Sequence, residues 1–504
     1  MAPPTCPSPA PLPELSPLTL PGPPPPPKLC PGLPQFFPLS PSQPSPPTPP
    51  PLFALPSWGP LPVLGLPPAP SSYLCPPEVL VLSSVGTIRE ALARHWGDWL
   101  GRPPSYLGSL VSRGGRDLAL GPPTPSWRRQ RGAARGALAR AGGRLRPLLK
   151  QQAEALCQEL QSHGGAPLDP FEIFSFHSCS TIGRLLFGDM TPPEEELRSF
   201  SRCLLQLLEV WGRSSVRVLD LIPALRVLPN PGLRQLLRLV QLRDSFVETQ
   251  IRRHEECPSP PSDTVLAALQ GRDPSVPGGP LSPPRLHMTL VDLFIGGTET
   301  TATALTWAVA FLLHRPELQD QLRAELWQEL GPSGPPELGG SGRLPLLQAT
   351  IAETLRLRPP APLALPHCAC RHTSLGGCPV PAGSILIPNL LAAHRDPHTW
   401  QRPDDFLPER FLCAEAPGRA PMLPFGCGAR ACPGEAVARA ELAAFLGQLL
   451  RRFRLLPAVP GALPRLDGGS AGTVLRCPPF RVRLLPCAAP PGAVPPSLTS
   501  ALPV

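Results

Sequence analysis

The sequence predicts a mainly α-helical fold with small β-sheets. Several long segments carry apolar residues at helical spacing or are apolar almost throughout, whereas the runs typical of strands are short. No internal repeat is visible, so a solenoid or a propeller is not expected. The 504 residues are enough to bury one large core.

The first regular elements are expected soon after residue 77. Residues 79–82 read as a short buried strand, and a helix follows in which Thr87 is a suitable N-cap with Glu90 at the capping-box spacing. Long helical patterns then occupy residues 128–160, 192–211 and 231–257. A loop rich in Pro, Ser and Gly, with one short helical piece, connects them to the second half at 258–284.

The second half begins with a long apolar helix at 285–314, which Pro316 closes. Two amphipathic helices are expected next, at 316–330 and 345–358. Short strands follow, the clearest at 384–388, before a last long helix at 434–453. Helices therefore dominate, and the sheets are small.

Both ends of the chain are low in complexity. Of the 82 prolines, 29 lie in the first 70 residues. Proline removes backbone donors and fixes φ, so residues 1–71 are expected to be a disordered leader, with 72–487 as the folded domain and 488–504 as a Pro-rich tail. The polyproline run at 23–27 could alternatively bind an SH3-like domain.

Charge and cysteine content exclude some classes of function. The formal net charge is +9, but aromatic residues make up 5% and no basic block is interleaved with them, so nucleic acid ranks behind anionic lipid and acidic proteins as a partner. The 15 cysteines form no CxxC pair, which disfavours a disulfide scaffold or a zinc ribbon. One special cysteine among buried thiols remains compatible with this pattern.

The membrane signals are weak. No run of 18 apolar residues and no signal-peptide pattern is present. Residues 52–66 are moderately apolar but contain Pro56, Pro60 and Pro62, so this segment is a poor spanning helix that could lie against a membrane surface.

One cysteine lies in a setting that favours its thiolate. The segment before the last helix reads Phe425-Gly426-Cys427-Gly428-Ala429-Arg430-Ala431-Cys432-Pro433-Gly434. Its glycines allow a tight turn close to a flat partner, and amide N–H groups with the adjacent helix N-terminus stabilise a negatively charged sulfur. Arg430 can direct its charge toward a nearby anion.

This segment resembles the haem-binding signature of the cytochrome P450 family at Phe425, Gly428, Arg430, Cys432 and Gly434. The resemblance implies a cytochrome P450 fold, with haem b between the long distal helix and the helix after the cysteine, and Cys432 as the axial iron ligand. A thiolate ligand favours O–O cleavage. In the family, electrons come from NADPH through the flavins of a reductase.

Other motifs agree with the resemblance. Glu353 and Arg356 are three residues apart on one helical face, and with Arg410 they match the family's buried structural network. Glycines at 296 and 297 interrupt the apolar helix, where the family makes room for dioxygen. Glu299 and Thr300 match the acid and alcohol that relay protons, and Thr300 can bond to the carbonyl of Gly296. The haem propionate contacts are matched by Trp127, Arg131, His367 and Arg430.

Over about residues 76–485 the chain is similar to the vertebrate steroid 21-hydroxylases within this family. The resemblance implies hydroxylation at C21 of progesterone and 17-hydroxyprogesterone in corticosteroid biosynthesis. Arg243 matches the arginine that binds the 3-keto oxygen, although a solvent-facing helix arginine is the alternative. The other substrate-lining positions are matched by Val111, Leu118, Trp211, Val291, Asp292 and Leu365.

The basic surplus would suit the family's reductase. A cluster on the cysteine side of the haem is expected from Arg128, Arg129, Arg135, Arg140 and Arg439, although a solvated helix face explains each equally well. The resemblance implies the endoplasmic reticulum membrane. The family's membrane anchor and first strands are replaced here by Pro-rich sequence, so no anchor helix supports that location.

Two alternatives remain open. A related monooxygenase could act at C17 of the steroid. A catalytically silent haem protein or a Pro-rich interaction protein is also compatible with the departure before residue 76, whereas the intact motifs at Cys432, Glu299 and Glu353 favour an enzyme.

Overall fold

The computed structural model describes residues 78–272, 279–330, 344–412, 422–471 and 474–487. The expected leader at 1–71, the apolar segment at 52–66 and the tail at 488–504 lie outside these residues. Domain boundaries at 71 and 487 therefore stay predictions.

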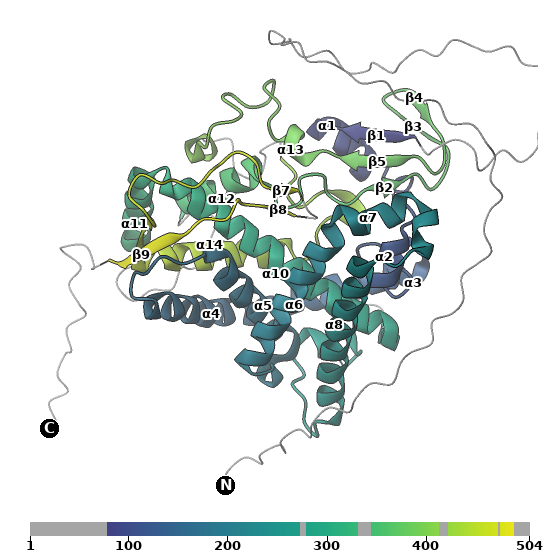
Figure 1. Ribbon diagram of the computed structural model, residues 1–504, viewed down its shortest axis with the longest axis horizontal. Coiled ribbons are helices and arrows are strands. Elements are labelled where there is room, and N and C mark those ends of the chain that lie inside the picture. Colours follow the sequence, from purple (N-terminus) through teal and green to yellow (C-terminus); the bar gives the residue numbers. More distant parts are fainter. Residues whose placement is uncertain (1–77, 273–278, 331–343, 413–421, 472–473, 488–504) are drawn as a thin grey trace, which may run out of the picture. The chain divides into compact units, whose positions relative to one another are not determined.

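Helices form most of the described chain (Figure 1). The α-helices are α1 Val85–Arg89, α2 Tyr106–Val111, α3 Pro125–Arg140, α4 Gly142–Ser162, α5 Pro170–Phe187, α6 Glu194–Gly212, α7 Ser214–Leu221, α8 Pro231–Glu256, α9 Val265–Leu269, α10 Pro283–Leu313, α11 Pro316–Leu330, α12 Pro345–Leu357, α13 Leu390–Ala393 and α14 Glu435–Arg452. Short 3₁₀ or π turns are η1 Glu90–Arg94, η2 Gly188–Met190, η3 Pro223–Val227, η4 Pro408–Phe411 and η6 Gly428–Arg430.

The described strands form small sheets. One sheet has the order β1-β5-β2, in which β1 runs parallel to β5 and β2 antiparallel to it, and the other strands pair as β3-β4, β6-β9 and β7-β8. The strands are β1 Val79–Leu82, β2 His367–Cys368, β3 Thr373–Leu375, β4 Cys378–Val380, β5 Ile385–Pro388, β6 Phe453–Pro457, β7 Ser470–Ala471, β8 Leu475–Arg476 and β9 Val482–Pro486. This balance confirms the predicted mainly α class with small sheets.

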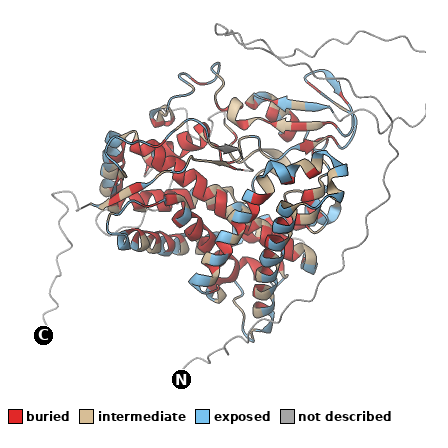
Figure 2. Cartoon of the chain, viewed as in Figure 1, coloured by how far each residue is buried: buried red, intermediate tan, exposed pale blue. Residues whose placement is uncertain are grey.

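Helix α10 is the centre of the core. It is buried over most of its 31 residues, and it packs against α5, α12 and α14. Figure 2 shows the central helices in red along most of their length, whereas α8 carries blue and tan on its outer side. A helix that is apolar all round must be surrounded by other elements. At the middle of α10, Gly297 packs against Ile182 of α5.

Several sequence predictions are confirmed, and three need correction. The N-cap of the first helix is Ser84, whose Oγ accepts from the N–H of Thr87, so Thr87 lies inside α1. The pattern at 128–160 is two helices that break at Ala141, because two consecutive glycines follow and lower the helix propensity. Strand β1 exists, but Val79 and Val81 are each 55% exposed, since β1 is the edge of its described sheet.

Helix α5 was not predicted from the sequence. Fifteen of its residues are buried, including polar side chains such as Ser178 and Thr181. A helix enclosed on all sides shows no alternation between a polar and an apolar face, so helical periodicity gives no signal. Its position against α10 and α14 became visible only in the folded chain.

Among the described residues, no helix combines the length and apolar character needed to cross a membrane.

Candidate functional site

The loop before α14 closes tightly around Cys432. The N–H of Cys432 donates to the carbonyl of Phe425 at 2.9 Å, and Gly426 has φ +72°, a conformation that side chains strongly disfavour. A Cβ on Gly428 would lie 1.7 Å from the carbonyl oxygen of Leu92. Only glycine fits there, because η6 is pressed against η1. These contacts explain the glycine spacing in the sequence.

Cys432 combines accessibility with an enclosed setting. Its side chain is exposed, yet protein surrounds it closely enough that burial raises the pKa of its thiol. The N–H of Gly434 at the start of α14 and the charge of Arg131 lower that pKa in opposition. Cys157 and Cys179, by contrast, are buried cysteines whose pKa is raised to about 12. Cys432 therefore has an open side, and the Gly434 N–H and Arg131 favour its thiolate while burial and Glu435 oppose it.

Helix α10 has an open position at its glycines. Gly296 is exposed in the middle of this buried helix, and a Cβ there would meet nothing within 4 Å. Gly297 instead packs against Ile182, where a Cβ would lie 2.5 Å from the side chain. The hydroxyl of Thr300 donates to the carbonyl of Gly296 at 2.5 Å, as the sequence predicts. Space next to Gly296 and Thr300 is what a ligand-binding distal helix requires.

Glu299 is buried next to Thr300 in sequence, but the two side chains are not hydrogen-bonded in the described structure. Its Oε1 is 2.5 Å from Nε of Arg476. Burial raises the pKa of Glu299, and Arg476 lowers it in opposition. The acid and the alcohol of the predicted relay therefore lie on the same helix with separate partners.

Arg430 and Arg131 both lie against the ring of Trp127 at the start of α3. Arg430 donates to the carbonyls of Leu100, Leu118, Ala119 and Gly121, and its guanidinium lies 4.0 Å from the centroid of the Trp127 ring. Arg131 donates to the carbonyl of Ala431, and its Nε is buried without a partner. Trp127 itself donates from Nε1 to Leu118. These contacts bring Trp127, Arg131 and Arg430 together.

Arg102 joins this group, although no sequence motif pointed to it. It donates to the carbonyls of Ala119, Leu365 and Pro366. His367 lies beside it and donates from Nδ1 to the carbonyl of Trp99 at 2.7 Å. Burial, and then the positive charges of Arg102 and Arg430, lower the pKa of His367 to about 3. Arg102 could be found only from the structure, because no motif surrounds it.

The cluster of Arg102, Arg131 and Arg430, here called the cationic cluster, has an excess of positive charge. Burial, followed by repulsion between arginines, lowers the pKa of Arg102 well below its usual value and those of Arg131 and Arg430 to about 10. Within the described residues, no carboxylate lies within ion-pair distance of these guanidinium groups; Asp117 interacts with two of them only at longer range. Buried cations of this kind need anions.

These observations test whether a haem fits. A thiol on an open side, a glycine-only turn beneath it, space beside Gly296 and a cationic cluster for two carboxylates are the groups that a haem with a thiolate ligand requires. Among the described residues no alternative metal cluster of three or more His, Cys, Asp or Glu side chains exists. The residues present fit haem.

A second polar network lies behind the cysteine loop. Glu353 accepts from Arg356 at 2.7 and 2.8 Å and from Arg410 at 3.1 Å, and the first two side chains are fully buried. Arg356 also donates to the carbonyl of His394 at 2.8 Å. The ring Nε2 of His394 accepts from the N–H of Leu423 at 2.7 Å, just before the cysteine loop. The three residues predicted to form a network do so, and His394, which the sequence did not suggest, connects them to the loop.

Arg243 is only 1% exposed, which rules out the solvent-facing alternative. It pairs with Asp244 at 2.6 Å and donates to the carbonyl of Val111 at 3.0 Å, so α8 is joined to the end of α2. Burial would raise the pKa of Asp244, but His287 and Arg243 outweigh it and lower that pKa to about 2. The Arg243 guanidinium is thus buried beside a carboxylate, with a backbone carbonyl as a second acceptor.

The other residues predicted to line the substrate pocket differ in burial and in their contacts. Asp292 accepts from the N–H of Leu118 at 2.5 Å, which ties α10 to the loop after α2, and burial raises the pKa of Asp292 well above its usual value. Val291 lies in the core beside them. Trp211 packs on the apolar cluster that contains Val111, whereas Leu365 is 41% exposed and offers its carbonyl to Arg102.

The expected basic residues are all exposed. Arg128, Arg129, Arg135 and Arg140 lie on α3 and Arg439 lies on α14. Arg439 pairs with Glu435 at 2.9 Å, one helical turn away. Arg131 joins α3 to the cysteine loop through Ala431, so the two helices that carry these arginines flank Cys432.

The fold and this site define a class. Residues 67–484 match the cytochrome P450 family, and the chain belongs to that family. This confirms the predicted cytochrome P450 fold, the haem iron and the monooxygenase class of enzyme.

The chain is also similar to individual members of this family. The chain is 44% identical over 429 residues to a protein named steroid 21-hydroxylase from Canis lupus, 45% over 422 residues to the one from Felis catus and 43% over 420 residues to the one from Homo sapiens; each match covers 81% of this chain and 84% of the relative. A zebrafish cytochrome P450 solved with progesterone aligns with a TM-score of 0.73 at 31% identity, over 82% of this chain and 95% of the other. A second structure, with abiraterone, gives 0.70 at 32% identity, over 81% and 93%.

Proposed function

We propose that this protein is a steroid 21-monooxygenase that hydroxylates progesterone and 17-hydroxyprogesterone. The observation that carries the proposal is the 43–45% identity, over four-fifths of the chain, to relatives named steroid 21-hydroxylase. The two zebrafish cytochrome P450 structures, solved with progesterone and with abiraterone, are less similar, at 31–32%. The proposal of C21 as the site of attack follows the names of the more similar relatives.

The described residues support separate roles in binding the haem and the substrate. Cys432 would hold the haem iron, and the cationic cluster with His367 would hold the haem carboxylates. When bound, the haem supplies the oxidising chemistry. Arg243 would donate to the steroid 3-keto oxygen, because its buried charge is fixed by Asp244 and Val111. One charged donor in an apolar pocket contributes about 1.5–3 kcal/mol and fixes orientation, which leaves the C21 end to react.

Electrons are proposed to arrive from NADPH through a flavin-containing reductase. The exposed arginines of α3 and α14 flank the cysteine loop, and an acidic protein surface would complement them. The expected consequence is a rate of reduction that falls steeply with ionic strength.

A membrane surface is the second proposed partner, at the endoplasmic reticulum. The segment between α7 and α8 exposes a run of large apolar side chains: Leu221 is 81% exposed and Val227 80%, with Ile222 and Leu228 beside them. Exposed apolar side chains this close together are typical of an interaction surface. Replacing Leu221 and Val227 by Ser should weaken binding to neutral phosphatidylcholine vesicles, measured by co-sedimentation, and leave haem content unchanged.

Product identification tests the activity. The full chain is incubated with NADPH, reductase and progesterone, and the product is identified by mass spectrometry against standards. A 21-hydroxylated product is expected. A 17-hydroxylated product would replace the proposal with the C17 alternative, and a haem-containing protein without product would leave the silent haem protein.

Two variants test individual residues in the same assay. Cys432→Ser should lose the red-shifted Soret band of the reduced carbon monoxide complex and all oxidation. Arg243→Ala should retain that band and bind progesterone more weakly, by about tenfold to a hundredfold for a lost charged hydrogen bond. Unchanged progesterone affinity would remove Arg243 from the pocket.

A further inference from the structure

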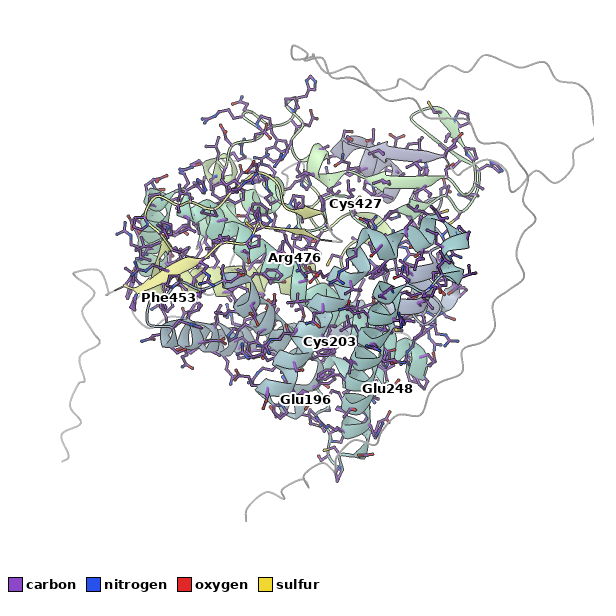
Figure 3. The ribbon with its side chains drawn as sticks, in the orientation of Figure 1. Glu196, Cys203, Glu248, Cys427, Phe453 and Arg476 are labelled. Atoms are coloured by element: carbon purple, nitrogen blue, oxygen red, sulfur yellow. The ribbon has the colours of Figure 1, made fainter. Side chains whose placement is uncertain are left out.

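Arg476 forms an ion pair with Glu299, although no sequence motif assigns it a role. Nε of Arg476 lies 2.5 Å from Oε1 of Glu299, and the Glu299 side chain is nearly fully buried. Glu299 belongs to α10 and Arg476 to β8, 177 positions later in the chain. Figure 3 labels Arg476 near the middle of the described ribbon. The pair therefore joins the proposed proton relay to a C-terminal strand.

Arg476 is held in place from several sides. The neighbouring Leu475 donates its N–H to the carbonyl of Pro360 at 2.8 Å and accepts from Nε1 of Trp307 at 2.8 Å. Trp307 lies on α10 itself, so β8 is attached to the helix that carries Glu299. The guanidinium also lies 4.8 Å from the centroid of the Phe171 ring on α5. A side chain fixed in this way can hold a carboxylate in one orientation.

The ion pair uses only part of the hydrogen-bonding capacity of each side chain. Oε2 of Glu299 and Nη2 of Arg476 are both buried without a hydrogen-bond partner among the described residues. A fully formed carboxylate–guanidinium pair would use two parallel hydrogen bonds. One oxygen of Glu299 is thus fixed, and the other remains able to accept a proton or a water molecule.

Arg476 is also the charged group that acts on Glu299. Burial raises the pKa of this carboxyl, and the charge and hydrogen bond of Arg476 lower it. Another buried carboxyl, Glu441 on α14, has a pKa that burial raises and that Thr181 and Ser178 of α5 lower, and Glu299 is not among the groups that act on it. Arg476 therefore opposes the effect of burial on the pKa of Glu299.

We propose that Arg476 is a positioning residue for proton delivery, which holds one oxygen of Glu299 so that the other takes up a proton from solvent and passes it toward Thr300. The inference rests on the proposed role of Glu299 and Thr300 in the monooxygenase reaction. The proton comes from water and leaves through the Thr300 hydroxyl, so Glu299 returns to its starting form after each transfer. Arg476 neither gives nor takes a proton.

The pH profile of product formation separates positioning from support of the fold. Arg476→Gln removes the charge, so the profile should move to higher pH, and Arg476→Lys should keep it near that of the wild-type protein. Arg465→Gln is the matched control, because Arg465 forms an exposed pair with Asp467 on the same C-terminal segment. A uniform loss of rate at every pH in Arg476→Gln would overturn the proposal.

If Arg476→Gln does not fold, Phe171→Leu provides a second test. This substitution removes the ring beside the guanidinium, and it should shift the pH profile less, in the same direction. An unshifted profile in Phe171→Leu would also overturn the proposal.

A measurement independent of turnover uses the thermal unfolding of four proteins: wild type, Arg476→Gln, Glu299→Gln and the double variant. The two substitutions should be non-additive at neutral pH, and the non-additivity should decline as acid protonates Glu299. Additive effects at neutral pH would show that the two groups do not interact, and the proposal would fall.

Glu299→Gln distinguishes this inference from the function on which it rests. A loss of about a hundredfold in turnover is expected for removal of a positioned acid or base. Full turnover in Glu299→Gln would remove the relay and the role of Arg476 together. A slow Glu299→Gln with an unshifted profile in Arg476→Gln would leave the relay standing and reject Arg476 alone.

Discussion

Two groups of buried or half-buried arginines lie near the cysteine loop, and they differ in what neutralises them. Around Glu353, one carboxylate accepts from both Arg356 and Arg410, and the spare N–H groups of these arginines reach backbone carbonyls. In the cationic cluster, carbonyls are the described acceptors, and no carboxylate lies within ion-pair distance. The charge of the first group is largely neutralised within the chain, whereas the charge of the second group requires an added anion.

This difference shows how to separate a structural network from a binding site. Burial alone marks both groups, so burial does not decide between them. The presence of a counter-ion distinguishes them. A buried cation without a counter-ion costs several kcal/mol unless a ligand supplies one. The haem carboxylates would supply it here, which is why the same residue type stabilises the fold in one place and is expected to bind a cofactor in the other.

The buried histidines beside these two groups of arginines show the same contrast. Burial and the charge of Arg356 lower the pKa of His394 to about 4. Burial and the charges of Arg102 and Arg430 lower that of His367 to about 3. His394 lies beside Arg356, which pairs with a carboxylate. His367 lies beside Arg102 and Arg430, which have no carboxylate within ion-pair distance among the described residues.

Glu353→Gln should have the largest effect. It leaves Arg356 buried without its counter-charge, so the free energy of unfolding should fall by about 3–5 kcal/mol, measured by urea unfolding. Glu409→Gln is a matched control, because Glu409 pairs with Arg315 at the surface, and it should cost about 1 kcal/mol or less. Equal effects of the two substitutions would contradict the comparison.

Arg430→Gln should act mainly on the haem. Without haem, relief of repulsion within the cationic cluster offsets part of the lost hydrogen bonds, so the loss of stability should be smaller than for Glu353→Gln. With haem, the rate of transfer to apomyoglobin should rise by about tenfold to a hundredfold, since one charged hydrogen bond contributes about 1.5–3 kcal/mol. Haem retention equal to wild type would remove Arg430 from the cofactor site.

The acid dependence of stability should separate the two histidines. Each stays neutral in the fold and takes a proton when unfolded, so stability falls as the pH drops below 6.5, toward about 4 for His394 and about 3 for His367. Each contributes at most about 1.4 kcal/mol per pH unit. Haem carboxylates should raise the pKa of His367 and leave that of His394 unchanged.

The measurement is urea unfolding between pH 7 and pH 5, with and without haem. His394→Asn should flatten the dependence equally in both forms, and His367→Asn should flatten it mainly in the haem-free form. Identical behaviour of the two variants in both forms would show that the cationic cluster is not where the haem carboxylates bind.

Glu441→Gln should remove a pH dependence of stability that has the opposite sign. Burial raises the pKa of Glu441 to about 8. The folded protein then binds a proton that the unfolded chain releases above about 4.5, so stability falls as the pH rises from 4.5 to 8. The variant should lack this decline, which urea unfolding across that range would reveal; an unchanged slope would place the Glu441 carboxyl in contact with solvent.

How far the sequence predicts this site depends on the kind of signal. The glycines at 426, 428 and 434, the cysteine and the Glu353–Arg356 spacing are local, so they could be found by reading the chain. Arg102, His394 and Arg476 could not be found that way, because each acts through partners that are distant in sequence: Arg102 meets Leu365, His394 meets Leu423 and Arg476 meets Glu299. No local pattern records such a contact.

The sequence by itself determined the helix-rich class, the order of most elements, the cysteine loop and the residue types that a haem-thiolate enzyme needs. Only the tertiary structure decided that Arg243 is buried, that α5 is a fully enclosed helix, and which buried arginines have a carboxylate and which do not. The physical reason is that helical periodicity and turn chemistry are set by neighbours within a few residues. Burial and charge neutralisation depend instead on groups that the fold brings together from hundreds of positions apart.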